Sequence, residues 1–398
     1  MESKQYQKRR SQLVHGCDMP IVIAAHNQLQ RKGDAAYGFD QEPNFWYLTG
    51  INEPDWWLII NGGRASLVQS DVSEVRRLFE GGMSASEAKE VSGVDDVIDR
   101  KQAMALLGEL ASAHKSAATI LPDKHSKYFG FVPNPAPAQM TRRLKRLFEE
   151  VIDCRLELSK QRAIKWPEEI AAITRAVNLT VSTFESVKNQ LPHLGYEYEV
   201  EAEFSYAFRR SGATGHAYDP IVAGGMHACT LHYGANQDQL PANGLVLIDI
   251  GARVDGYAAD ITRTYAIGTP TDRQIAVHQA VEHAHHEIIT LLRPGLDVRE
   301  YHDQVDIIMK RALTGLGLMK DENDKAYRTY FPHAISHGLG IDVHDSLGRA
   351  EVLLPGMVLT VEPGIYIPEE GIGVRIEDDI LITESGHRNL SAALSTSL

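Results

Sequence analysis

Residues 244–268 read GLVLIDIGARVDGYAADITRTYAIG, and this stretch decides the fold of the C-terminal part of the chain. It predicts two β-strands joined at an Asp-Gly dipeptide (255–256), which two-residue hairpin loops favour. Counting outward from that loop places Asp249 opposite Thr262 and makes Asp260 the diagonal neighbour of Asp249 on the same face. Diagonal neighbours lie about 7–8 Å apart, so both carboxylates would reach a common metal ion or an adjacent pair of ions.

A second stretch near the C-terminus repeats this pattern. GMVLTVEPGIY (356–366) and GIGVRIEDDILIT (371–383) supply Glu362 at the end of one strand and Glu377 within another, and strand alternation places Arg375 on the face of Glu377. The openings GLVL and GMVL indicate an internal repeat, which is imperfect because the acid follows the glycine by five positions in one case and six in the other. Four carboxylates among Val, Leu and Ile would be costly to bury without cations, and two divalent ions would balance them. A bond to nearby backbone or to an arginine is the alternative for any one acid alone.

A glycine-rich segment, FPHAISHGLGIDVHDSLG (331–348), carries His333, His337 and His344. Its glycines favour a loop over a continuous helix, and its HxxxH spacing lacks the glutamate of the HExxH zinc helix. His232 lies in CTLHYGAN, shortly before the first acidic hairpin. The histidines therefore predict a site built on loops.

The length of 398 residues is too great for one ordinary core and predicts two domains. From about residue 20 to 150, short apolar runs alternate with helical stretches, which is typical of a small α/β domain. The texture changes at SKQRAIKWPEEIAAITRA (159–176), which places Pro167 at the first position of a helix. We therefore expect an α/β domain at 1–158 and an α+β domain at 159–398 that carries the chemistry.

Five aromatic side chains gather in the first domain: Phe45, Trp46, Tyr47, Trp56 and Trp57. No catalytic residue types accompany them at telling spacings. We interpret this cluster as core packing, with a wall of a substrate pocket or a subunit contact as the alternative.

The composition limits the classes of protein to which the chain can belong. With 43% hydrophobic and 23% charged residues and no biased tract, it is typical of a globular protein. The formal net charge of -13 would repel a polyanion, so we expect no nucleic-acid partner. No stretch approaches the roughly 18 apolar residues of a membrane span, and the basic opening lacks an apolar core, so we expect a cytoplasmic protein with no membrane partner. Three cysteines without metal-ligand spacing, Cys17, Cys154 and Cys229, argue against a disulfide framework.

Taken in order, the motifs resemble those of the pita-bread metallopeptidases, which comprise prolidase, aminopeptidase P and methionine aminopeptidase. LHYGAN, LIDIG, DITRTY, SHGLGIDVHD, VEPGIY and GVRIEDD occur in the order of that family. RRSQLV (9–14) and NFWYLTGINEPD (44–55) resemble the creatinase-type N-terminal domain of the prolidase and aminopeptidase P branch, which methionine aminopeptidases lack. Over nearly the whole chain, the resemblance implies a creatinase-type α/β N-terminal domain followed by a pita-bread catalytic domain.

Carried over to this sequence, the resemblance implies five metal ligands. Asp249, Asp260 and Glu377 would hold one divalent ion, and Asp260, His337, Glu362 and Glu377 would hold the other. Oxygen-rich ligation with one imidazole favours manganese, with cobalt or zinc as alternatives. A water or hydroxide between the two ions would be the nucleophile, and Glu362 is the candidate for accepting its proton.

The resemblance also implies roles for residues that do not hold metal. His232 and His344 would position the substrate and stabilise the transition state. His333 would form a wall of the pocket for the residue after the cleaved bond. Tyr366 and Arg375 would orient these groups from behind.

Two activities within the family fit the motifs. Prolidase accepts only dipeptides, whereas aminopeptidase P accepts longer peptides with proline second. The separation of 15 residues between Glu362 and Glu377 resembles the compact prolidases, while the N-terminal motifs and DITRTY are closer to aminopeptidase P. We favour an Xaa-Pro dipeptidase, with an Xaa-Pro aminopeptidase as the alternative.

Two further alternatives lie outside the peptidases. Creatinase shares the fold without keeping the five ligands, and peptide-binding modules of this fold typically lose ligands, whereas this chain keeps all five. The resemblance also implies a homodimer formed through the N-terminal domain and a proline-containing di- or oligopeptide as the substrate.

Overall fold

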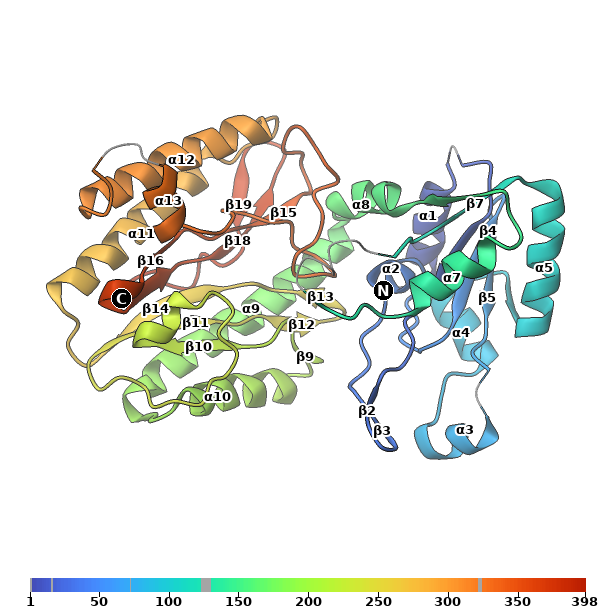
Figure 1. Ribbon diagram of the computed structural model, residues 1–398, viewed down its shortest axis with the longest axis horizontal. Helices are drawn as coiled ribbons and strands as arrows, with labels where there is room; N and C mark the ends of the chain where they lie inside the picture. Colours follow the sequence, from blue (N-terminus) through green and yellow to red (C-terminus); the bar gives the residue numbers. More distant parts are fainter. Residues whose placement is uncertain (1, 16, 72, 123–129, 321–323) are drawn as a thin grey trace. The chain divides into compact units, whose positions relative to one another are not determined.

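The computed structural model describes residues 2–15, 17–71, 73–122, 130–320 and 324–398. The chain divides into two compact units, Met1–Gln161 and Arg162–Leu398. Each unit combines helices with β-strands (Figure 1). Within the described ranges, no helix has both the length and the apolar character that crossing a membrane would require.

The N-terminal unit is built on a six-stranded sheet with the strand order β6-β5-β4-β1-β7-β8. Its strands are β1 (Ile21–Ala24), β4 (Trp57–Asn61), β5 (Arg64–Val68), β6 (Asp96–Ile98), β7 (Ser116–Thr119) and β8 (Glu150–Asp153), with a separate ribbon of β2 (Gln30–Lys32) and β3 (Ala35–Ala36). Its helices are α1 (Ser3–Leu13), α2 (Pro43–Thr49), α3 (Glu74–Glu80), α4 (Ala85–Ser92), α5 (Arg100–Ala113), α7 (Ala136–Leu144) and α8 (Arg155–Ala163), within which the division falls. The sheet is mixed, since β4 is antiparallel to β1 and β5 while β7 runs parallel to β1 and β8. The predicted α/β character of this part is confirmed.

The aromatic residues of this unit lie largely inside it. Phe45, Tyr47, Trp56 and Trp57 are buried, and Trp57 belongs to the apolar core beside the sheet. Trp46 is half-buried and meets Tyr6 edge-on, with ring centroids 6.5 Å apart. These positions support the interpretation of the cluster as core packing.

The C-terminal unit repeats one arrangement, in which a pair of long helices precedes a β-hairpin, with a short third helix added in the second copy. The first set comprises α9 (Pro167–Gln190), the 3-10 helix η1 (Leu191–His193), α10 (Glu197–Arg210), β9 (Gly215–His216), β10 (Ile221–Gly224), η2 (Gly225–Cys229), β11 (Gly244–Asp249), β12 (Ala252–Val254), β13 (Tyr257–Ala258) and β14 (Thr262–Ile267). The second comprises α11 (Asp272–Leu291), α12 (Val298–Gly315), α13 (Asp324–Tyr330), β15 (Val358–Val361), β16 (Gly364–Ile367), η3 (Pro368–Glu370), β17 (Ile372–Arg375), β18 (Asp378–Ile382) and β19 (His387–Asn389). In Figure 1 the green α9 and α10 and the orange α11 and α12 flank the yellow and red strands. The predicted α+β class is confirmed.

The first hairpin has the register predicted from its loop. Both loop residues have positive φ, 51° at Asp255 and 82° at Gly256, as this kind of tight turn requires. Val254 pairs with Tyr257 beside the loop, and Asp249 pairs with Thr262 further out. The ladder between these pairs is interrupted, so the hairpin consists of an inner pair (β12, β13) and an outer pair (β11, β14).

The second hairpin has the same two-part construction. The inner pair is β16 and β17, closed by η3, and the outer pair is β15 and β18. Apolar residues of this hairpin pack on α11 and α12 in one hydrophobic core cluster, as Val281, Val305, Leu359 and Val374 illustrate. This core fixes the hairpin from one side and leaves its other side for polar groups.

A fully buried arginine, Arg263 on β14, joins the two hairpins. Its Nη1 donates to the carbonyl oxygens of Thr262 and Glu377 at 2.9 and 2.7 Å, and its Nη2 donates to Asp378 Oδ1 at 2.7 Å. Two further bonds go to the carbonyl oxygens of Leu394 and Ser395 near the C-terminus. The guanidinium therefore satisfies backbone groups of both hairpins and one buried carboxylate.

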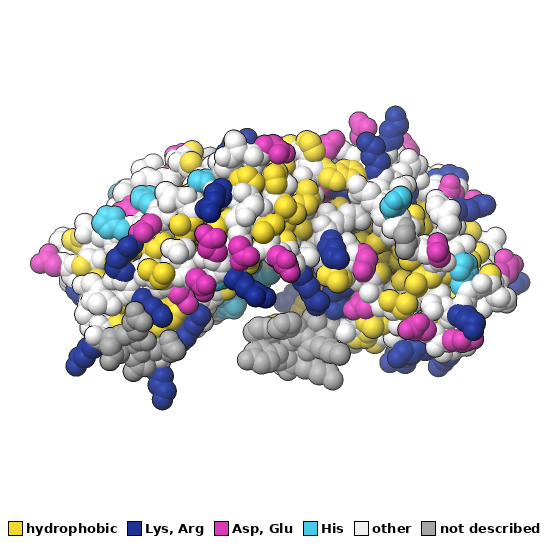
Figure 2. Space-filling model, turned by 90° about the horizontal axis from the view of Figure 1, so that it is seen from above, with side chains coloured by type: hydrophobic (Ala, Val, Ile, Leu, Met, Phe, Trp, Pro, Cys, Tyr) yellow, Lys and Arg dark blue, Asp and Glu magenta, His cyan; other side chains and the backbone are white. Residues whose placement is uncertain are grey.

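Acidic and basic side chains are mixed over the surface that Figure 2 shows. Dark blue Lys and Arg side chains and magenta Asp and Glu side chains alternate over short distances on that face. The excess of acid in the composition is therefore spread over this face rather than gathered in one area of it.

Candidate metal centre

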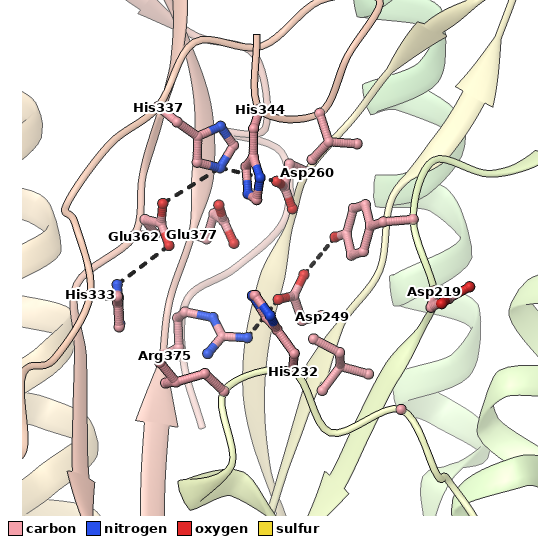
Figure 3. Close-up of a pocket in the computed structure, with 15 residues that line it drawn as sticks. Asp219, His232, Asp249, Asp260, His333, His337, His344, Glu362, Arg375 and Glu377 are labelled. Carbon is pink, nitrogen blue, oxygen red and sulfur yellow. Dashed lines mark hydrogen bonds and ion pairs between the residues drawn. The ribbon is translucent and has the colours of Figure 1, made fainter. Parts of the chain in front are cut away.

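A cavity of about 370 Å³ opens beside the two hairpins. All five predicted metal ligands line it: Asp249, Asp260, His337, Glu362 and Glu377. The other residues predicted for the site that line it are His232, His333, His344 and Arg375. Figure 3 shows these side chains pointing toward a common space from the hairpins and from two loops.

The four carboxylates lie where the two ladders are interrupted. Asp249 ends β11, Asp260 lies between β13 and β14, Glu362 between β15 and β16, and Glu377 between β17 and β18. The pairs on either side of the second interruption bring Glu362 opposite Glu377. Gly251 is required at the first interruption, because a Cβ there would lie 1.7 Å from the carbonyl oxygen of Ala259. Each interruption thus turns acidic side chains toward the cavity, whereas an uninterrupted strand would place some of them elsewhere.

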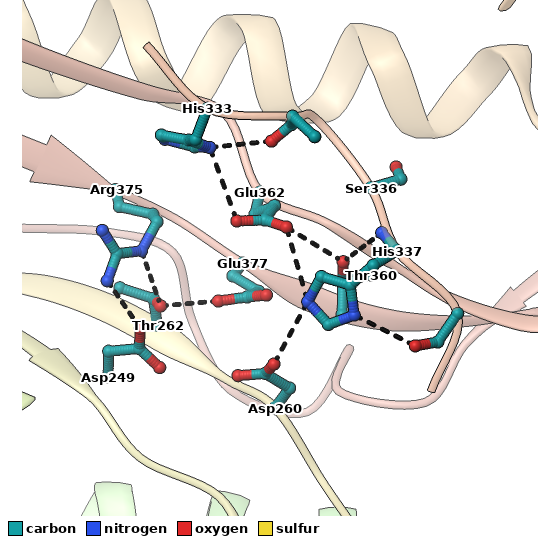
Figure 4. Close-up of polar contacts among 12 residues, drawn as sticks. Asp249, Asp260, Thr262, His333, Ser336, His337, Thr360, Glu362, Arg375 and Glu377 are labelled. Carbon is teal, nitrogen blue, oxygen red and sulfur yellow. Dashed lines mark hydrogen bonds and ion pairs between the residues drawn. The ribbon is translucent and has the colours of Figure 1, made fainter. Parts of the chain in front are cut away.

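The two hairpins meet at Thr262, which forms an isolated β-bridge with Glu377 (Figure 4). The Glu377 N–H donates to the Thr262 carbonyl oxygen at 3.0 Å. The Thr262 Oγ1 donates to Glu377 Oε2 at 2.7 Å. This bridge brings the acids of the first hairpin beside those of the second.

His337 is the imidazole that faces the carboxylates. Its Nδ1 lies 3.0 Å from the carbonyl oxygen of Gly338, to which it donates in the neutral ring. Its Nε2 then points at the acids, 3.4 Å from Asp260 Oδ2 and 3.5 Å from Glu362 Oε1. Asp260, His337 and Glu377 each offer one ligand atom within 4.8 Å of the others. A carbonyl that fixes the ring tautomer in this way is a common support for a metal-binding histidine.

The electrostatics of the cavity fit bound cations. Burial raises the pKa of Asp249, of Glu362 to about 7, and of Glu377 well above its ordinary value. Burial lowers the pKa of His337, but its bond to Asp260 and the charges of the acids outweigh burial and raise that pKa to about 9. The acids repel one another, and the Arg375 guanidinium donates to the carboxylate of Asp249, so further positive charge in the cavity would stabilise the ionised forms of the acids. Four carboxylates and one imidazole are also a donor set that suits divalent ions.

Arg375 is the centre of a hydrogen-bond chain behind the acids. Its Nη2 donates to Asp249 Oδ2 at 2.5 Å, its Nε to Thr262 Oγ1 at 3.2 Å and its Nη1 to the Tyr366 hydroxyl at 2.8 Å. The Tyr366 hydroxyl lies 2.8 Å from His333 Nε2, and His333 Nδ1 lies 2.7 Å from the Ala334 carbonyl oxygen. Burial lowers the pKa of His333 to about 3, so its ring is neutral and Nε2 accepts the tyrosine proton. The chain holds Asp249 and His333 in fixed orientations.

His232 and His344 lie on loops at the mouth of the cavity. His232 is exposed and belongs to the loop between η2 and β11. The exposed His344 ring meets the His337 ring edge-on, with centroids 4.3 Å apart. Both rings therefore stand where a ligand entering the cavity would pass.

Two residues of the centre carried no assignment from the sequence. The Tyr218 hydroxyl donates to Asp249 Oδ1 at 2.5 Å, and Asp379 Oδ2 accepts from the Asp260 N–H at 3.1 Å inside the core. The sequence around Tyr218 contains no pattern that indicates this contact with Asp249. The two acids of IEDD are evident in the sequence, but the path of β18 decides which of them faces Asp260.

Two known families match consecutive parts of the chain. Residues 171–384 match the family described as "Metallopeptidase family M24". Residues 6–120 match "Aminopeptidase P, N-terminal domain". The matches cover the hairpins of the C-terminal unit and the sheet of the N-terminal unit up to β7.

Curated proteins and solved structures agree with these matches. The "Xaa-Pro aminopeptidase" of Escherichia coli K12 is 33% identical over 98% of this chain and 95% of its own length. "Xaa-Pro aminopeptidase 1" of Streptomyces coelicolor is 33% identical over 94% of this chain and 81% of its own length. The structure "Aminopeptidase P from E. coli with the inhibitor Pro-Leu" has a TM-score of 0.86 and 31% identity, covering 100% of this chain and 96% of that chain. "Proline aminopeptidase P II from Yersinia pestis" has a TM-score of 0.86 and 32% identity, covering 100% of this chain and 98% of that chain.

Proposed function

The chain belongs to metallopeptidase family M24, as its motifs predicted, and from this premise we propose that it is an Xaa-Pro aminopeptidase that removes the first residue of peptides with proline second. The observation that carries the proposal is the similarity to Xaa-Pro aminopeptidases over both units at once. A metal-dependent hydrolase requires a ligand set, and the convergence of four carboxylates and His337 on one cavity supplies it.

The preference for a dipeptidase is not supported. The comparisons favour the alternative, because the relatives that match the whole chain are named Xaa-Pro aminopeptidases. The 15-residue separation of Glu362 and Glu377 was a poor guide for a physical reason. It measures the length of the inner pair β16 and β17 and its closing turn η3, and it carries no information on the other walls of the cavity.

For the metal ions we propose the ligands predicted from the sequence. Asp249, Asp260 and Glu377 would hold one ion, and Asp260, His337, Glu362 and Glu377 the other, with manganese as the first choice and cobalt or zinc as alternatives. Bound there, two divalent ions would supply Lewis acidity that acidifies a water and polarises the scissile carbonyl.

The remaining chemistry falls to side chains. Glu362 would accept the proton of the attacking water, because its carboxylate lines the cavity and its Oε1 lies 3.5 Å from His337 Nε2. His232 and His344, at the cavity mouth, would contact the peptide and stabilise charge on its carbonyl oxygen. His333, held by Tyr366 and Arg375, would form a wall for the proline ring. An Xaa-Pro bond has no N–H that could donate a hydrogen bond to the enzyme. A site that binds the carbonyl group and the proline ring instead does not need that hydrogen bond.

We also propose that the two units are the domains expected at 1–158 and 159–398. The homodimer and the cytoplasmic location stay predictions from the sequence and its resemblance.

Peptide length is the measurement that decides between the two activities. Manganese-loaded protein is incubated with Ala-Pro and with Ala-Pro-Yaa tripeptides, and release of alanine is followed. We expect cleavage of the tripeptides at least about tenfold faster in kcat/KM, because the extra residue adds binding energy. Asp260→Asn serves as the control that removes a proposed ligand and abolishes release. Cleavage of the dipeptide alone would restore the dipeptidase, and cleavage of neither would favour a peptide-binding module.

A further inference from the structure

The loop that carries His232, residues 224–238, is tied to a single buried carboxylate. Glu197 begins α10 and is 0% exposed. Its Oε1 accepts the Gly224 N–H at 3.0 Å, and its Oε2 accepts the Asp238 N–H at 3.0 Å. Its own N–H donates to the Asp238 carbonyl oxygen at 3.0 Å. Glu197 therefore binds the first and last residues of the loop.

Two side chains from inside the loop reach the same carboxylate. His227 Nδ1 lies 2.9 Å from Oε1, and the Tyr233 hydroxyl donates to Oε2 at 2.9 Å. The rings of His227 and Tyr233 stack on each other, with centroids 4.3 Å apart and planes 17° apart. Tyr233 directly follows His232, so the tether acts one residue away from the imidazole at the cavity.

This group is an anchor for the loop rather than a second metal site. Glu197, His227 and Asp238 do offer ligand atoms within 4.8 Å of one another. Each oxygen of Glu197, however, already accepts two protein donors, so its lone pairs are in use. His227 Nε2 lies 3.3 Å from Asp238, which closes the group on itself.

The other side of the loop rests on the second hairpin. Cys229 Sγ lies 3.4 Å from the Ile372 carbonyl oxygen. A Cβ at Gly373 would lie 2.4 Å from the carbonyl oxygen of Ala228, so glycine permits this close approach. Leu231, His232 and Gly234 then line the cavity. The loop is held between Glu197 and β17, and its free edge forms a wall of the site.

We propose that Glu197 is a positioning residue, which fixes the 224–238 loop so that His232 stands where the peptide substrate needs it. The proposal rests on the proposed function for the role of His232, while the attachment of the loop to Glu197 stands on the contacts alone. A carboxylate is suited to this task because it only accepts, and all four of its partners in the loop donate.

Glu197→Gln is the decisive variant. It keeps the size of the side chain but turns one acceptor into an NH2 group that faces two donors, so it should release part of the loop. We expect kcat/KM for an Xaa-Pro-Yaa peptide to fall by about 10- to 100-fold, since small displacements of a contacting group have effects of that size, with unchanged metal content. Glu199→Gln is the matched control, because Glu199 caps the same helix and accepts from the N–H groups of Gly195 and Tyr196, outside the 224–238 loop. It should stay within about twofold of the starting protein.

A double-mutant cycle with His232→Ala separates positioning from general damage. If Glu197 acts through His232, Glu197→Gln causes no further loss of kcat/KM beyond about twofold in the His232→Ala background. Additive losses would overturn the proposal. Should Glu197→Gln fail to fold, Tyr233→Phe removes one of the four loop bonds and is taken through the same cycle. As a single substitution, Tyr233→Phe should lower kcat/KM. Added to His232→Ala, it should leave kcat/KM unchanged.

Amide hydrogen exchange tests the anchor without any substrate. In Glu197→Gln, peptides covering 224–238 should exchange at least about tenfold faster while those covering the first hairpin, 244–267, stay unchanged. Unchanged exchange in the loop would overturn the proposal even if activity fell. If the starting protein cleaves no Xaa-Pro peptide, the proposed function fails, and the exchange result still decides whether Glu197 holds the loop.

Discussion

Two buried arginines, Arg375 and Arg263, hold the acids and the two hairpins of this site in place. Arg375 was predicted to face the acids, because strand alternation puts it on the side of Glu377, and the structure places it against Asp249. The part played by Arg263 was invisible in the sequence, where it is one charge in DITRTY. Its five acceptors come from segments more than a hundred residues away and from its own strand. Spacing reveals neighbours within a hairpin, and it says nothing of contacts made by the packing of two hairpins.

Replacing Arg263 should be among the most damaging changes to stability. Arg263→Met leaves the Asp378 carboxylate and several carbonyl oxygens buried without their donor, and we expect a loss of about 3–5 kcal/mol in the free energy of unfolding. Urea denaturation measures the loss. The control is Arg273→Met, which breaks a partly exposed pair with Glu370 and should cost about 1 kcal/mol or less. Equal effects of the two substitutions would show that Arg263 does not join the hairpins.

The interrupted hairpin is the element that makes this site. Its first copy could be read from the sequence, because an Asp-Gly loop fixes the turn and every pair outward from it, and Asp249 does lie opposite Thr262. The second copy could not be counted in the same way, since η3 replaces the two-residue turn and the acid follows its glycine by one more position. The bridge between Thr262 and Glu377 joins segments that are separated by α11, α12 and α13, so no local pattern could indicate it.

Gly251 tests the interruption in the first hairpin. In Gly251→Ala the new methyl group would overlap the Ala259 carbonyl oxygen, so the two strands must separate where Asp249 and Asp260 project. We expect metal affinity to fall by at least about tenfold, the size of effect that displaced ligand supports produce. Isothermal titration with manganese measures it.

The comparison variant for this test is Gly315→Ala, at an exposed end of α12 where a methyl group meets no atom within 4 Å. Alanine should raise helix stability there by about 0.5–1 kcal/mol and leave metal affinity unchanged. Wild-type affinity in Gly251→Ala would contradict the account of the interruption.

For the whole molecule, the sequence was most informative about the kind of architecture and about which acids and which imidazole meet at one cavity. Four acids within apolar strands drew attention to the site, and the family resemblance implied their role as metal ligands. Peptide length preference was not readable, because it depends on what surrounds the cavity rather than on the acids themselves. The proposed preference for longer peptides rests on the similarity of both units to Xaa-Pro aminopeptidases.

Metal binding should be visible in the stability of the C-terminal unit. Ions that bind the folded chain alone stabilise it by about 4 kcal/mol when present at a thousand times their dissociation constant. Chelation should therefore lower the midpoint of thermal unfolding, and readdition of manganese should restore it. Asp260→Asn, which lacks the proposed shared ligand, should show little of this response, and an identical melting curve with and without metal would exclude the proposed centre.

The repeated construction of the C-terminal unit also marks a place where the polypeptide could be divided. The first hairpin ends at Ile267 and α11 begins at Asp272, with an exposed connection between them. A cut there yields two fragments that carry two of the four carboxylates each, so neither fragment holds the set alone. Reassociation would have to rebuild the Thr262–Glu377 bridge before four acids faced one cavity. The unit could therefore be made into a split enzyme at this connection. Its activity would then report on the reassociation of the two fragments.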